Sequence, residues 1–67
     1  MSSLCLSLAQ FEVLDGALSS YLRDASPRNE SRLFDAVIDL IGYDAACDVP
    51  SLSQWAAGVV TRYLVAA

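Results

Sequence analysis

The chain contains neither histidine nor lysine, and its only cationic side chains are four arginines. It therefore has no imidazole to act as a general base near neutral pH and no amine nucleophile. Without histidine it also lacks the commonest side-chain ligand for transition metals. We expect no enzymatic activity, no metal site and no cofactor, and we expect the protein to act by binding.

Positive charge is scarce as well, because eight acidic residues leave the 67-residue chain with a net charge of −4. Affinity for nucleic acid depends on cationic side chains that neutralise phosphates, so we expect no direct contact with DNA or RNA. The longest uncharged stretches, 1–11 and 49–61, are shorter than the roughly 20 apolar residues that cross a bilayer. We expect no membrane association, and we expect a partner protein with a basic surface.

The chain start points to the cytoplasm, and this location bears on the state of the two cysteines. No positive charge precedes the first apolar run, so residues 1–11 do not resemble a secretory signal. The two cysteines, Cys5 and Cys47, permit one intramolecular disulfide, but a reducing compartment keeps them as thiols. We expect both to pack as small core residues, with a disulfide as the alternative.

Turn-forming residues divide the chain into three segments of helical length, 8–24, 27–41 and 51–66. The first follows Ser7 and has Gln10 at the spacing of a capping box. The second begins at Ser26-Pro27 and should end at Gly42, which suits a left-handed cap. We predict a single all-α domain over 1–67, a small antiparallel three-helix bundle with a short fourth helical turn around 43–48.

Apolar residues recur at intervals of three and four in each segment, as on one face of a helix. In the first segment the residues expected to face the core are Leu8, Phe11, Leu14, Ala17, Leu18, Tyr21 and Leu22. In the second they are Leu33, Phe34, Val37, Ile38, Leu40 and Ile41. In the third they are Leu52, Trp55, Ala56, Val59, Val60, Tyr63 and Leu64.

An acidic series is the first candidate for a binding site. Asp35 and Asp39 lie one turn apart on the polar side of the second helix, and Asp44 and Asp48 continue the series into the connection. Negative charge near a helix C-terminus costs about 0.3–1 kcal/mol, so this placement does not optimise stability. We predict that these four residues and Tyr43 contact the partner. The alternative is that the acids only keep the chain soluble.

A face of small, uncharged residues on the third helix is the second candidate. Ala57, Gly58, Thr61 and Val65 lie opposite the expected core face, where charged residues would normally solvate a helix. Small residues at this spacing let a second helix approach closely, so this face is a candidate dimer seam. It could instead be covered within one chain by Leu4, Cys5 and Leu6.

These features favour two functions. In size, acidity and lack of reactive side chains the chain is similar to small phage-encoded inhibitors, including anti-CRISPR proteins, several of which cover basic nucleic-acid channels. That similarity implies a non-enzymatic protein that binds and inhibits or regulates a larger partner. The alternative is a structural or assembly module that acts through helix pairing or homodimerisation.

Overall fold

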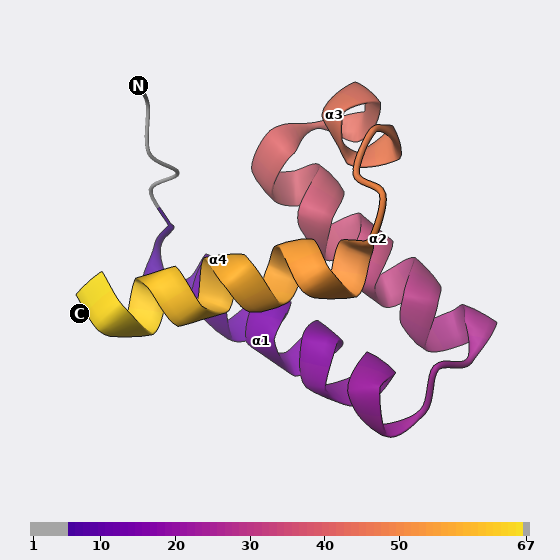
Figure 1. The fold of residues 1–67 in the computed structure, drawn as a ribbon, viewed down its shortest axis with the longest axis horizontal. Helices are drawn as coiled ribbons and strands as arrows, with labels where there is room; N and C mark the ends of the chain where they lie inside the picture. The colour runs from indigo at the N-terminus through magenta and orange to yellow at the C-terminus, as the bar shows by residue number, and fades with distance from the viewer. Residues whose placement is uncertain (1–5, 67) are drawn as a thin grey trace.

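The structure is a computed structural model that describes residues 6–66, and it is built entirely from helices linked by short connections. The helices are α1 (Leu8–Arg23), α2 (Pro27–Ile41), α3 (Tyr43–Cys47) and α4 (Leu52–Ala66), as Figure 1 shows. The predicted all-α class is confirmed, and the short turn expected at 43–48 is the helix α3. The ends of α1 and α4 differ from the expected ranges by one residue.

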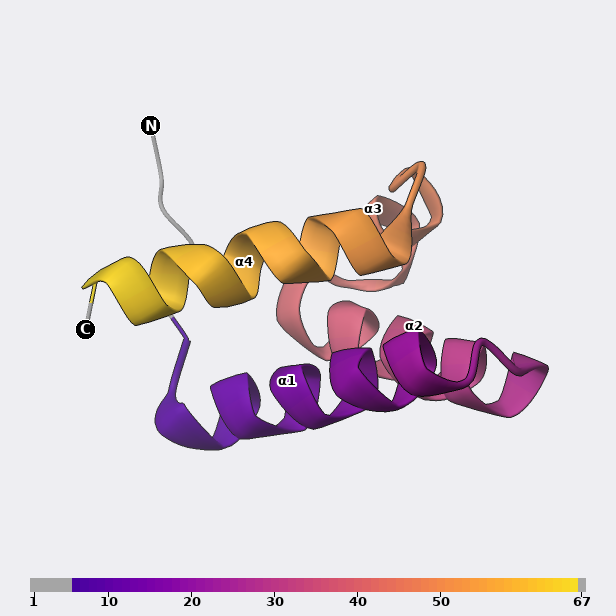
Figure 2. The same cartoon turned by 60° about the horizontal axis from the view of Figure 1, so that its bottom comes forward.

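The three long helices pack around one core. Figures 1 and 2 show α1 and α4 side by side and running in opposite directions, with α2 crossing them. α1 contacts both α2 and α4, while α2 also contacts α3 and α4. α1 therefore has two neighbours, and the angle between α1 and α2 leaves part of both helices facing solvent. No helix in the described part of the chain combines the length and the apolar character needed to span a membrane.

Helix ends follow the local signals of the sequence. The Gln10 backbone N–H donates to Ser7 Oγ over 3.1 Å, and the Ser7 N–H donates to Gln10 Oε1 over 2.9 Å, which completes the capping box. Ser26 Oγ accepts from the Asn29 N–H over 3.3 Å at the start of α2. Gly42 has a φ of 90°, so it ends α2 in a conformation that other residues rarely adopt.

The side chain of Asn29 ties α2 to the end of α1. Its Nδ2 donates to the Ser20 carbonyl over 3.3 Å and to the Asp24 carbonyl over 2.8 Å. Ser20 lies in the last turn of α1, where its carbonyl also accepts from the backbone N–H of Asp24, and Asp24 is the C-cap of α1. One amide thus fixes how α1 and α2 are aligned along each other.

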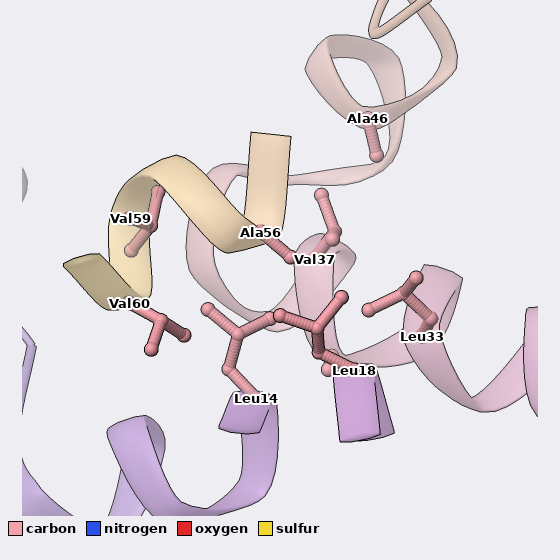
Figure 3. Close-up of a cluster of buried hydrophobic side chains, with 9 residues drawn as sticks. Leu14, Leu18, Leu33, Val37, Ala46, Ala56, Val59 and Val60 are labelled. Atoms are coloured by element: carbon pink, nitrogen blue, oxygen red, sulfur yellow. The ribbon is translucent and has the colours of Figure 1, made fainter. Parts of the chain in front are cut away.

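The core is small and entirely apolar among the described residues. Its members lie on all four helices: Leu14, Leu18, Leu33, Ala36, Val37, Ala46, Ala56, Val59 and Val60. In Figure 3 the side chains of Leu14 and Leu18 point from α1 toward those of α2 and α4. Leu14, Leu33 and Val37 are almost completely removed from solvent. Residues 6–66 contain no buried polar side chain that would require a partner.

Four residues expected in the core are exposed instead. Leu8, Leu22 and Leu64 lie in the end turns of α1 and α4, where the other described helices cover less than half of each side chain. Cys47 is also exposed, at the end of α3, so our expectation that it packs in the core is wrong. Cys5 lies outside the described residues.

Candidate partner-binding surfaces

A groove with a volume of about 530 Å³ runs between α1 and α2. On α1 it is lined by Glu12, Val13, Gly16, Ala17 and Ser20. On α2 it is lined by Arg32, Asp35, Ala36 and Asp39. The sequence places these residues on one face of each helix, because they recur at intervals of three and four.

Small residues create the groove. Gly16 and Ala17 on α1 lie opposite Ala36 on α2, and Ala36 is buried at the bottom of the contact. A Cβ atom added to Gly16 would meet nothing within 4 Å, so the space above it is open. The groove has an apolar floor as a result. Val13 adds an apolar side chain to its wall and is 61% exposed.

Charge is distributed unevenly along the groove. Asn29 bonds to the Ser20 carbonyl near the short connection of α1 and α2, so Ser20 and Arg32 line the end of the groove close to this connection, and Glu12 and Asp39 line the end farther from it. Asp35 lies between them on α2. Three carboxylates and one guanidinium therefore surround the apolar floor, with the carboxylates concentrated toward the Glu12–Asp39 end.

The carboxylates of this groove are available to a partner. Glu12, Asp35 and Asp39 are all exposed. Within residues 6–66, no side-chain hydrogen bond uses any of these three acids. Binding a cationic side chain would therefore not require an existing side-chain hydrogen bond of these acids to break.

Tyr43 is exposed, as the sequence predicts, with 57% of its surface accessible. Its ring meets the edge of Phe34 with centroids 6.0 Å apart and planes at 76°, so α2 holds it in a defined position. A hydrogen bond to Cys47, then the charge of that residue and slight desolvation, raise the pKa of Tyr43 above its usual value of 10.0. The phenol is therefore neutral and able to donate a hydrogen bond at physiological pH.

The five residues of the predicted acidic site do not form one continuous stripe. The chain changes direction at Gly42, so Asp44 lies in the first turn of α3 rather than on the line of Asp35 and Asp39. Asp48 lines a separate hollow together with Pro50 and Trp55. The groove thus brings Asp35 and Asp39 together with an acid from another helix, while Asp48 belongs to a different surface.

The small-residue face of α4 is open to solvent. Ala57, Gly58, Thr61 and Val65 are all exposed, and Val65 is 82% accessible. Leu64 extends this apolar face toward the end of the helix. Leu6 packs against the core, while Leu4 and Cys5 lie outside the described residues. Pairing of this face with a second copy stays a prediction.

Sequence reasoning missed the contribution of α1 to the groove. Neither Glu12 nor Gly16 is among the contact residues that the sequence predicts. A signal was nonetheless present, because Gly16, Ala17 and Ser20 are small residues on one side of α1, and Ala36 is the small residue on the matching side of α2. Small residues at a helix contact leave room that a third element can fill.

Comparisons with protein-family models, curated proteins and solved structures found no match for the chain. Among the described residues, no three acidic or cysteine side chains come together in an arrangement able to hold a metal ion. The function of the protein must therefore be inferred from two exposed surfaces, the α1–α2 groove and the α4 face.

Proposed function

We propose that this is a non-enzymatic protein that binds and inhibits or regulates a larger protein with a basic surface, as small phage-encoded inhibitors do. The observation that supports this most is the α1–α2 groove, where Glu12, Asp35 and Asp39 surround an apolar floor. A surface that binds nucleic acid carries arginine and lysine side chains in close array. Carboxylates grouped over an apolar patch complement such a surface in charge.

Ion pairs and apolar contact contribute differently to the free energy of binding. An exposed ion pair contributes about 0.2–1 kcal/mol, and salt screens it. Burial of apolar surface contributes about 25 cal/mol per Å², so every 100 Å² covered contributes about 2.5 kcal/mol. Apolar contact would therefore supply most of the affinity, while the carboxylates would speed association and set orientation.

The test is charge reversal at the groove. Asp35→Arg combined with Asp39→Arg should abolish capture of the partner from lysate of a host cell, with the captured protein identified by mass spectrometry. The matched control is Asp24→Arg with Glu30→Arg, which changes the net charge equally at exposed positions that do not line the groove. Loss of capture in the control as well, or retention in the groove variant, would contradict the proposal.

A second candidate, an assembly module, is favoured by the exposed apolar face of α4. A face with Ala57, Gly58, Thr61 and Val65 suits close pairing with the same helix of another copy. Light scattering coupled to size exclusion would then give a dimer mass, and Thr61→Glu would return the protein to a monomer. A monomer mass for the unmodified protein at all accessible concentrations would exclude this function.

A further inference from the structure

We propose that the α1–α2 groove binds one amphipathic α-helix of the partner, whose narrow apolar side contacts the floor and whose arginine or lysine side chains reach Glu12, Asp35 and Asp39. This inference rests on the proposed function and specifies what the partner presents. It follows from the shape of the groove, the backbone of its walls and the placement of its charges.

The shape of the groove fits a helix. Its walls are two helices in contact, and from Glu12 to Ser20 it extends about 12 Å at 1.5 Å per residue. That length matches about two turns of a bound helix. The floor of Gly16, Ala17 and Ala36 lets such a helix approach closely, as small residues do wherever helices pack at short range.

The backbone of the groove walls excludes an extended peptide, which is the main alternative to a bound helix. An extended peptide binds by adding a strand to the edge of a sheet, where free backbone N–H and C=O groups accept it. Both walls here are the middle turns of α-helices, whose backbone groups are already paired within the helix. Specificity must therefore come from side chains, which is how an amphipathic helix binds a groove.

The charges around the groove indicate which side chains the bound helix must carry. To contact Val13 and the groove floor, the bound helix needs a narrow apolar side. To pair with the carboxylates at the groove edges, it needs cationic side chains next to that apolar side. Arg32 disfavours a further cation at its own end of the groove, so the basic side chains of the bound helix belong near the Glu12–Asp39 end. A uniformly basic peptide without an apolar side would satisfy only part of this surface.

Gly16 offers a direct test because the space above it is empty. Gly16→Leu would place a side chain in the groove, and its Cβ atom would meet nothing within 4 Å. Ser31→Leu on α2 is the matched control, because Ser31 is also an exposed helical residue and lies outside both the groove and the α4 face. Both variants should fold, and circular dichroism should show unchanged helix content and no loss of thermal stability.

The probe is a fluorescent synthetic peptide of about 18 residues, long enough to cover the groove, with an alanine and leucine side flanked by lysines. Fluorescence anisotropy should show binding that is at least about tenfold weaker for three pairings. These are Gly16→Leu with the probe, Glu12→Arg with the probe, and the unmodified protein with a sequence-scrambled peptide of equal charge. Ser31→Leu and Glu30→Arg should bind the probe as the unmodified protein does.

Equal binding of the probe and its scrambled form would overturn the inference, because general charge attraction would then explain it. Unchanged binding by Gly16→Leu would overturn it too. Capture of the natural partner by two variants distinguishes failure of this inference from failure of the proposed function. If Asp35→Arg with Asp39→Arg loses the partner while Gly16→Leu keeps it, the helix inference fails and the proposed function stands. If both variants keep the partner, both fail.

Discussion

The rings of Phe11 and Tyr63 stack with centroids 4.2 Å apart and planes within 15° of parallel. Phe11 lies in the first turn of α1 and Tyr63 near the end of α4, so this one contact joins residues from opposite ends of the chain. Leu8 and Leu64 nearby are exposed and add little burial. The stacked pair is therefore the main apolar contact that holds the end of α4 against α1.

Removing either ring should loosen this end of the molecule. We expect Tyr63→Ala to lower the free energy of unfolding by about 1–3 kcal/mol, below the 3–5 kcal/mol typical of a fully buried aromatic, because Tyr63 is only half-buried. Tyr63→Phe should change it by less than about 0.5 kcal/mol. Urea denaturation checks both values. A double-mutant cycle with Phe11→Ala should give a coupling of about 0.5–1.5 kcal/mol, and zero coupling would contradict the stacking contact.

The amide of Asn29 should contribute to stability beyond its place near the helix cap. Asn29→Ala removes both bonds to the Ser20 and Asp24 carbonyls, and we expect a loss of about 1–2 kcal/mol. Asn29→Asp has nearly the same shape but cannot donate, so it should lose at least as much. The backbone N–H of residue 29 still reaches Ser26 Oγ in both variants, which isolates the side chain. Chemical denaturation in which both variants match the unmodified protein would show that the amide is dispensable.

Local signals account for most of what the sequence predicts correctly. The bond between Ser7 and Gln10, the Ser26-Pro27 start and the turn at Gly42 each depend on residues within a few positions of one another. Such signals identify where helices begin and end without knowledge of the fold. This is why the helical class and the short α3 were predictable.

The groove was not predictable in the same way, because it depends on two helices at once. Whether Glu12 and Asp39 line the same groove depends on how α1 is rotated and aligned against α2. The shared core, which includes Leu14 and Leu33, and the bonds of Asn29 determine that alignment, and neither is visible in the periodicity of a single helix. The exposure of Leu22 was unpredictable for the same reason. The periodicity of α1 continues to the end of the helix, but it does not tell whether a neighbouring helix covers that end.

Glycines at two positions should respond oppositely to the same substitution. Gly42→Ala should destabilise the protein by at least about 1 kcal/mol, because a φ of 90° strains a residue that has a Cβ. Gly16→Ala should stabilise it by about 0.5–1 kcal/mol, because glycine is a poor helix former and the added methyl group meets no neighbour. Thermal denaturation of both variants tests the contrast. The same sign of change at both positions would contradict the backbone conformations.

The titration of Tyr43 should depend on Cys47. A hydrogen bond to that thiol and its charge raise the pKa of Tyr43 in the folded protein above its ordinary value of 10.0. The protonated phenol is thus favoured by folding, so its contribution to stability is present below pH 10.0 and is lost as the pH rises through the higher folded value. In a background with Tyr21→Phe and Tyr63→Phe, near-ultraviolet absorbance follows Tyr43 alone. Adding Cys47→Ala should move the midpoint down toward 10.0, whereas an unmoved midpoint would show that the thiol does not contact the phenol.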